Sequence, residues 1–343
     1  MNERTQSIVE EFKIAYAHRV YFTENVFAPE NALLASTISE CSSAGRPRVL
    51  VVADAAFLAA NRGVPAQMTR FFEHHHEAIQ YMGCLELPGG EQLKNQPEYL
   101  EHLYRAIEAK KLCRHSYIIA LGGGALLDLV GFAAATAHRG IRHLRLPTTS
   151  LSQGDGGCGE KNGINYFGKK NFIGTYTPPV AVITDIGFLK SLPAPRLIDG
   201  FIEAIKVALI KDKRFFEYIE AQTQAILERD FTVIRQVLEA SARHHVLHIA
   251  RSGDPFELTS SRPLDFGHWS AHKLEVLSDY ALSHGEAVAI GIALDSIYSQ
   301  KKGFLSEAKL ERILQLVQAF GFRIYDERLS KLTQDGQYVI LLG

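Results

Sequence analysis

In the first half of this chain, short apolar runs alternate with amphipathic stretches, and this order leaves few folds open. Four runs have the character of buried strands, at residues 48–54, 116–121, 144–149 and 181–185. Between them, residues 98–112 carry apolar side chains at helical spacing, and residues 125–137 are apolar on nearly every side. Strand and helix repeated in this way predict a mostly parallel sheet covered on both faces. Pro147 has no amide hydrogen for a sheet, so we expect it at a strand end.

The second half of the chain has a helical pattern. After Pro193 and Pro195, four segments are predicted to be helices, at residues 197–220, 232–250, 271–280 and 285–300. Strand-like alternation returns only at residues 338–342. We therefore predict an α/β domain over residues 1–188 and an all-α domain over residues 189–343.

Charge and length exclude several classes of protein. The 343 residues are enough for two domains, and 37 Lys+Arg against 38 Asp+Glu give a net charge of -1. A balanced charge predicts no nucleic-acid partner and no membrane surface. The longest apolar stretch, residues 117–137, contains a run of three consecutive glycines and Asp128, which argues against a membrane helix.

The ends and the cysteines predict the compartment. The first thirteen residues are polar and lack the apolar core of a signal peptide, so we expect no leader. The four cysteines are scattered without metal-ligand spacing. We therefore expect free thiols and a cytoplasmic protein.

A glycine-rich turn follows the second predicted strand. Gly122, Gly123 and Gly124 open the next helix, where backbone N–H groups could hold a pyrophosphate. Their spacing differs from the usual dinucleotide fingerprint, so a tight strand-to-helix turn without a ligand is an equal alternative. Asp54 ends an earlier strand and could accept hydrogen bonds from a ribose, or simply cap a helix.

Three residues in the helical half are candidate metal ligands. Glu203, His268 and His284 supply one carboxylate and two imidazoles, a set that suits a catalytic zinc ion with one open position. His272 follows His268 by one helical turn, so both could face one cleft. The alternative is chance proximity, because the chain contains 14 histidines.

The segment from Asp155 to Asn171 is a candidate anion site. It is rich in glycine and contains three lysines, which suits a phosphate or a polyol. The alternative is a surface loop with solvated lysines. Arg139 and Lys206 add positive charge that would be costly to bury without an anionic partner.

Several motifs in sequence order resemble the 3-dehydroquinate synthase family, also called sugar phosphate cyclases. The longest is GGGALLDLVGFAAATAHRG at residues 122–140. The others are PGGEQLK at 88–94, LPTT at 146–149, KNGIN at 161–165, KN at 170–171, FIEAIK at 201–206, FGH at 266–268 and HGE at 284–286. Together they extend the resemblance over roughly residues 48–300.

The resemblance implies a fold and a reaction. It implies a Rossmann-like NAD-binding domain, a helical domain that binds zinc or cobalt, an active site between them, and a homodimer. Members of this family are lyases that convert a seven-carbon sugar phosphate into a carbocycle. They oxidise an alcohol transiently with NAD+, eliminate phosphate, reduce the ketone again and close the ring by an aldol step.

The resemblance also implies roles for individual residues. Metal ligands would be Glu203, His268 and His284. Asp155 and Lys206 would orient ring hydroxyls, and His272 would shuttle a proton. The phosphate or adjacent hydroxyls would be held by Arg139, Lys161, Lys170 and Asn171. The cofactor would be bound by Asp54, Glu91, Lys94, Gly123, Gly124, Asp128, Thr148 and Thr149.

Departures from the family pattern leave the substrate open. Where dehydroquinate-forming members have an Arg and an Asn before the first zinc histidine, this chain has Ser261 and Asp265. Asp265 would repel a carboxylate and suits sedoheptulose 7-phosphate or a related heptulose phosphate. Arg262 could instead bind the carboxylate of 3-deoxy-arabino-heptulosonate 7-phosphate. His272 is often missing in enzymes of the neutral substrate, so genuine 3-dehydroquinate synthesis stays an alternative.

Other departures keep two further alternatives open. The family's lysine in the helix before the first zinc histidine falls on Leu247, and Lys331 alone remains of a C-terminal lysine pair. One alternative is an iron-type polyol or glycerol dehydrogenase, which would release NADH. The other is a non-catalytic nucleotide-binding scaffold.

Overall fold

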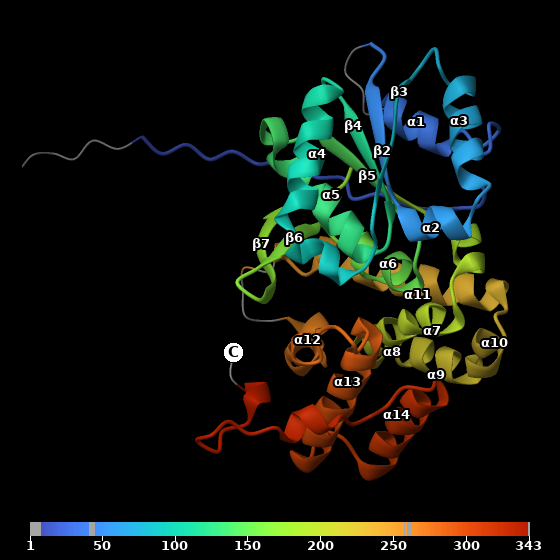
Figure 1. Cartoon of the computed structure of the whole chain (residues 1–343). Helices are drawn as coiled ribbons and strands as arrows, with labels where there is room; N and C mark the ends of the chain where they lie inside the picture. The colour runs from blue at the N-terminus through green and yellow to red at the C-terminus, as the bar shows by residue number, and fades with distance from the viewer. Residues whose placement is uncertain (1–7, 41–44, 257, 259–261, 342–343) are drawn as a thin grey trace, which may run out of the picture.

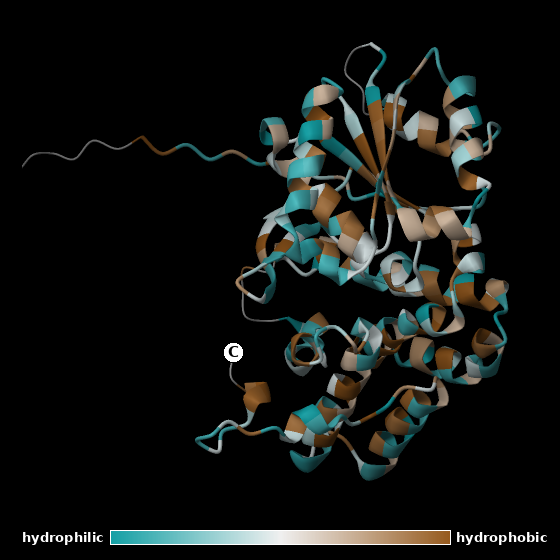
Figure 2. Ribbon diagram, viewed as in Figure 1, coloured by the Kyte–Doolittle hydropathy of each residue, from teal (hydrophilic) through white to brown (hydrophobic). Residues whose placement is uncertain are grey.

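The computed structural model describes residues 8–40, 45–256, 258 and 262–341, and a parallel sheet forms the centre of the first half (Figure 1). Among these residues the sheet has six strands in the order β1-β8-β5-β4-β2-β3, and every neighbouring pair is parallel. The strands are β1 (Val20–Thr23), β2 (Arg48–Asp54), β3 (Gln80–Leu87), β4 (Tyr117–Gly122), β5 (Arg142–Pro147) and β8 (Ala181–Asp185). Apolar residues dominate central strands such as β2 and β4, and the apolar parts of the sheet are brown in Figure 2.

Helices cover both faces of this sheet because successive strand residues point to opposite sides. In β2, Val49 and Val51 belong to the core that contains residues of α1 (Leu33–Glu40), α2 (Ala55–Ala60) and α3 (Val64–His74). Leu50 and Val52 belong instead to the core with α4 (Pro97–Ala109) and α5 (Gly124–Thr136). The alternation of burial therefore gives the helix–sheet–helix layering that was predicted.

A β-hairpin projects from the first half and carries the lysine-rich segment. After the short helix α6 (Ser150–Gly154), β6 (Lys161–Tyr166) pairs antiparallel with β7 (Lys169–Tyr176). The fully buried guanidinium of Arg145 donates hydrogen bonds to the backbone oxygens of Gly157, Gly159 and Lys161 at 2.6–3.1 Å. The loop that precedes the hairpin is therefore tied to the sheet.

Helices form the second half of the described chain. They are α7 (Ala194–Asp199), α8 (Phe201–Lys211), α9 (Lys213–Ala221), α10 (Thr223–Leu227), α11 (Phe231–Arg251), α12 (His268–Leu277), α13 (His284–Lys301) and α14 (Glu307–Ala319). Their apolar faces share one core, which includes Phe201, Leu274 and Ile290. Short 3-10 turns connect elements along the chain: η1 (Glu91–Asn95), η2 (Ala137–Arg139), η3 (Gly156–Cys158), η4 (Ile186–Ser191), η5 (Pro263–Asp265), η6 (Glu327–Ser330) and η7 (Val339–Leu341).

Most predicted elements are confirmed within one to three residues. Pro147 is the last residue of β5, as expected. The single helix predicted at 197–220 is wrong, because the chain breaks at Gly200 and at Asp212, whose side chain caps α9. The strand predicted at 338–342 is also wrong in its described part, where residues 339–341 form a 3-10 turn.

Throughout the described ranges, no helix is both long enough and apolar enough to cross a bilayer.

Candidate active site

The first candidate metal ligand, Glu203, lies in the first turn of α8 and is almost completely buried. Gly200 caps this helix, and a side chain there would overlap the backbone of Leu151 in α6. Because residue 200 is glycine, α8 can pack closely against α6. This packing directs the carboxylate of Glu203, in the first turn of α8, toward the interior. The helix start is fixed by backbone contact.

The two histidines begin the helices α12 and α13. Gly267 precedes His268 with a φ of +77°, a left-handed conformation that favours glycine. Its N–H donates to the carboxylate of Asp295 on α13 at 2.6 Å. Ser283 caps α13, and its side chain accepts from the N–H of Glu286 at 3.1 Å. Both histidines therefore sit at helix starts that are held by specific contacts.

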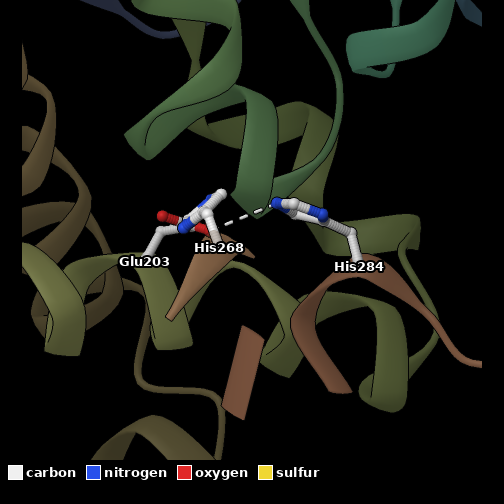
Figure 3. Close-up of side chains that lie close together, drawn as sticks. All are labelled: Glu203, His268 and His284. Atoms are coloured by element: carbon white, nitrogen blue, oxygen red, sulfur yellow. Dashed lines mark ion pairs between the residues drawn. The ribbon is translucent and has the colours of Figure 1, made fainter. Parts of the chain in front are cut away.

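Glu203, His268 and His284 point toward one another from three helices (Figure 3). Their nearest ligand atoms all lie within 4.8 Å of one another. The Nε2 atoms of His268 and His284 lie 3.4 and 3.3 Å from one oxygen of Glu203. The fit to a metal ion is good, because Oε1 of Glu203, the buried oxygen that faces both imidazoles, has no partner with hydrogen-bond geometry among the described residues, while Oε2 pairs with Lys206.

Charges around the cluster favour an ionised carboxylate. Burial alone would raise the pKa of Glu203, but Lys206 and then His268 bring it well below its ordinary value. Lys206 lies one turn along α8 and also pairs with Asp155 at 3.5 Å. An anionic, buried oxygen next to two imidazoles is the donor set that a zinc-type ion requires.

Glu275 is a neighbour of this cluster that sequence reasoning missed. Its buried carboxylate lies 3.2 Å from Nδ1 of His284 and 2.8 Å from Nζ of Lys170. Burial would lower the pKa of His284, but the charge of Glu275 raises it to about 9. Glu275 follows His268 and His272 on one face of α12, and this spacing is the signal that could have found it.

A second missed residue is His245 on α11. Its Nδ1 atom lies 2.6 Å from the carboxylate of Asp155. Burial would lower the pKa of His245, but Asp155 outweighs that effect and raises it. Leu247, which stands where the family has a lysine, is thus two residues away from His245, which faces the site.

His272 lies beside the metal cluster, as its spacing predicted. Its ring centroid is 5.4 Å from that of His268 and 6.1 Å from that of His284. Burial, and then the charge of Lys170, lower its pKa to about 3. The imidazole is therefore neutral near pH 7.

The residues predicted to hold the nucleotide gather at the carboxyl edge of the sheet. Lys94 on η1 is buried and pairs with Asp128 on α5 at 2.8 Å and with Glu91 at 3.4 Å. It also donates to the side chain of Asn171 on β7. Asn165, a residue not singled out from the sequence, donates to Glu91 at 3.1 Å. This network joins η1, α5 and the hairpin.

The glycine turn leads into α5 with Gly123 as its cap. A side chain at Gly89 would overlap the carboxylate of Asp54, which caps α2 through the N–H of Ala56. Thr149 caps α6 in a reciprocal bond pair with Ser152, and Thr148 before it is buried. The remaining predicted nucleotide residue, Gly124, is the first residue of α5. Helix starts and close backbone approach at this edge fit a dinucleotide.

The other predicted site residues are exposed, in contrast to the buried metal cluster. Arg139 is exposed on η2, at the end of α5 opposite the glycine turn. Lys161 begins β6 with an exposed side chain. Arg262 and Asp265 are also exposed, at and before η5. Ser261 lies outside the described residues.

Comparison with protein families gives two adjacent matches. A model described as the N-terminal part of 3-dehydroquinate synthase matches residues 84–199, and one described as its C-terminal part matches residues 200–336. A curated 3-dehydroquinate synthase of Halorhodospira halophila is 35% identical over 272 residues, which are 79% of this chain and 75% of the relative. The predicted division at residue 188 stays a prediction.

Solved structures with the same fold include two cyclases. ValA, a 2-epi-5-epi-valiolone synthase from Streptomyces hygroscopicus with NAD+ and Zn2+ bound, superposes with a TM-score of 0.81 at 27% identity, over 94% of this chain and 84% of that chain. A 2-deoxy-scyllo-inosose synthase with carbaglucose-6-phosphate, NAD+ and Co2+ gives a TM-score of 0.74 at 22% identity, over 90% and 81%. At 22% identity, the similarity to the 2-deoxy-scyllo-inosose synthase shows a shared fold and nothing further.

Proposed function

Because this chain belongs to the 3-dehydroquinate synthase family, we propose that it is a sugar phosphate cyclase that acts on a heptulose phosphate. In this reaction class a seven-carbon ketose phosphate loses phosphate and becomes a carbocycle, through transient oxidation, β-elimination, re-reduction and aldol closure. The observation that carries the proposal is the buried cluster of Glu203, His268 and His284. We further propose NAD and a zinc or cobalt ion as its cofactors.

The cofactors and the protein have separate tasks. When bound, NAD+ accepts the transient hydride, and the metal ion on Glu203, His268 and His284 acts as a Lewis acid toward the substrate alcohol. Gly123 and Gly124 would offer backbone N–H groups to the pyrophosphate. Asp54, Glu91, Lys94, Asp128, Thr148 and Thr149 would complete the nucleotide site.

Charged side chains near the cluster would orient the sugar. Asp155 and Lys206 form one ion pair, so a ring hydroxyl can donate to the carboxylate and accept from the ammonium group. His272 lies beside the cluster, where it would shuttle a proton to or from the substrate. Lys161, Lys170 and Asn171 would hold the phosphate that leaves, whereas Arg139, at the opposite end of α5 from the glycine turn, is left out of this set.

The substrate class rests on Asp265. Asp265 precedes His268 by three residues, and a carboxylate there would disfavour an anionic carboxylate on the substrate, so we propose sedoheptulose 7-phosphate or a related neutral heptulose phosphate. A second candidate is 3-deoxy-arabino-heptulosonate 7-phosphate. It is favoured by the adjacent Arg262 and by the relatives that are named 3-dehydroquinate synthase.

We propose a homodimer as the working form. The hairpin exposes Tyr166, Phe167 and Phe172, whose rings contact one another, and such a patch suits a second copy of the chain. Light scattering after size-exclusion chromatography tests this, and a monomer at micromolar concentration would contradict it.

Phosphate release tests the function. The enzyme is incubated with NAD+, zinc and one of the two heptulose phosphates, and a control contains a metal chelator. The masses of the products are measured by mass spectrometry. We expect release from sedoheptulose 7-phosphate that stops on chelation. Release from 3-deoxy-arabino-heptulosonate 7-phosphate alone would support the second candidate. Steady accumulation of NADH would contradict both and indicate a dehydrogenase.

A further inference from the structure

We propose that Glu275 is a positioning residue that fixes the imidazole ring of His284 and ties Lys170 to the metal cluster. The inference rests on the proposed function, because it assumes that His284 binds a metal ion. Glu275 lies in α12, His284 begins α13, and Lys170 belongs to β7. One buried carboxylate thus contacts three elements, each of which contributes to the site.

The first contact sets which ring nitrogen faces the metal position. Nδ1 of His284 lies 3.2 Å from one oxygen of Glu275, while Nε2 lies 3.3 Å from Glu203. A hydrogen on Nδ1 that is donated to Glu275 leaves the lone pair of Nε2 directed at the metal position. Metal-binding histidines commonly need such a partner, which fixes the ring and increases its basicity.

The second contact keeps Glu275 itself from binding the ion. A competing set of ligand atoms exists on His272, Glu275 and His284, and it shares His284 with the first set. Both oxygens of Glu275 are bonded to Nζ of Lys170, at 2.8 and 3.0 Å. The ammonium group already supplies a cation to both of these oxygens. On Glu203, by contrast, Lys206 pairs with Oε2 while Oε1 faces the two imidazoles, so a metal ion is directed to the set that contains Glu203.

Burial makes this arrangement selective. The side chains of Glu275 and Lys170 are 4% and 12% exposed, so water competes little for either. Loss of the carboxylate would leave Nδ1 of His284 without this acceptor and leave the ammonium group of Lys170 without its partner. The ring could then rotate, and the hairpin would lose its tie to α12.

Titration with Co2+ tests the proposal without any measurement of turnover. Metal-free parent, Glu275→Ala and Glu275→Gln are titrated, and the visible absorption of bound Co2+ gives the Kd and the coordination. We expect a 10- to 100-fold higher Kd for Glu275→Ala. A smaller increase is expected for Glu275→Gln, whose amide oxygen still accepts from Nδ1.

A matched control is Glu220→Gln. Glu220 also pairs with a basic side chain, Arg312 at 2.7 Å, but on the surface of α9 and α14. The Kd of the Glu220→Gln variant for Co2+ should equal that of the parent protein. A cooperative thermal unfolding transition confirms that each variant is folded. If Glu275→Ala does not fold, the test rests on Glu275→Gln.

Proton NMR of the Co2+-loaded protein gives a second readout. The Nδ1 hydrogen of a ligand histidine is strongly shifted and exchanges slowly with water while it is hydrogen-bonded. Glu275→Ala should lose one such signal, and Glu275→Gln should keep it. Unchanged Kd and signals in folded Glu275→Ala would overturn the role of Glu275 and leave the function standing. A parent that binds no Co2+ would overturn the proposed function and this role together.

Discussion

The Nε2 atom of His284 lies 3.3 Å from a carboxylate oxygen of Glu203, so the start of α13 faces the start of α8. The contact joins two residues far apart in the chain, and it forms only when both helices pack in the shared core. Metal affinity should therefore report directly on this geometry.

Replacement of Glu203 by Gln should weaken Co2+ binding about 100-fold or more. The change removes the anionic ligand and leaves Lys206 next to a neutral amide in a buried position. Equilibrium dialysis with metal analysis measures the loss. Retention of parental affinity would show that the ion binds elsewhere.

Replacement of Lys94 by Met should lower the free energy of unfolding by about 2–3 kcal/mol. The lysine is buried, and its loss leaves Asp128 and Glu91 without a cation. Both carboxylates are partly exposed, at 24% and 20%, so the cost stays below that of a fully buried pair. Urea unfolding measures the change. Asp128→Asn in the same background should recover part of it, and the absence of recovery would contradict this pairing.

Replacement of Gly291 by Ala should destabilise the protein by about 3 kcal/mol and displace the turn before His268. A side chain at Gly291 would overlap the backbone of Gly267, which cannot move without shifting α12. Gly63→Ala is the control, because nothing lies within 4 Å of a side chain there and its φ is -78°. Differential calorimetry compares the two, and equal effects would contradict the close approach of α12 and α13.

Acid should destabilise the fold through His143. Burial, and then the charge of Arg145, lower the pKa of this histidine to about 3, against about 6.5 in the unfolded chain. Between these values the unfolded state binds the extra proton, so stability falls as the pH falls below about 6.5. The loss should reach about 2 kcal/mol at pH 5.

The variant His143→Leu isolates this effect. Nε2 of His143 has no hydrogen-bond partner among the described residues, so an apolar side chain of similar size is tolerated. Urea unfolding of both metal-free proteins at pH 7 and pH 5 should show a steeper loss in the parent. Parallel pH profiles would mean that His143 is protonated without cost.

Replacement of Asp265 by Asn should improve the use of a carboxylated substrate. The change removes a negative charge that disfavours the substrate's carboxylate. The ratio of kcat/KM for 3-deoxy-arabino-heptulosonate 7-phosphate to that for sedoheptulose 7-phosphate should rise about tenfold, the effect of one modest charge interaction. An unchanged ratio would remove Asp265 from the specificity argument.

Local sequence patterns predicted much of the sheet and many of the helices. Buried strands such as 48–54 are continuous apolar runs, and the helix predicted at 285–300 begins one residue earlier, at His284, whereas the helix predicted at 271–280 begins three residues earlier, at His268. By contrast, β1 has only four residues and is half-buried, so its pattern is weak. The break at Asp212 is a cap within the charged run at residues 211–214, and hydrophobic periodicity alone does not detect it.

The candidate site was predictable where chemistry follows from residue type. A carboxylate and two histidines suggested a metal set, and the helical spacing of Glu275 after His268 and His272 could have added it, but the partner His245 depends on how α11 packs against Asp155. Lys94 illustrates the same limit, because its partner Asp128 lies on another helix and its third contact, Asn171, lies on the hairpin. Tertiary contacts of this kind leave no local signature in the sequence.

The buried guanidinium of Arg145 also bears on enzyme engineering. Its bonds to the backbone oxygens of Gly157, Gly159 and Lys161 make one strand residue the brace of the loop between α6 and β6. A loop grafted from another cyclase would keep these hydrogen bonds only if its backbone carbonyl groups lay within reach of Arg145. Transplants that aim to reprogram the substrate should therefore exchange β5 together with the loop.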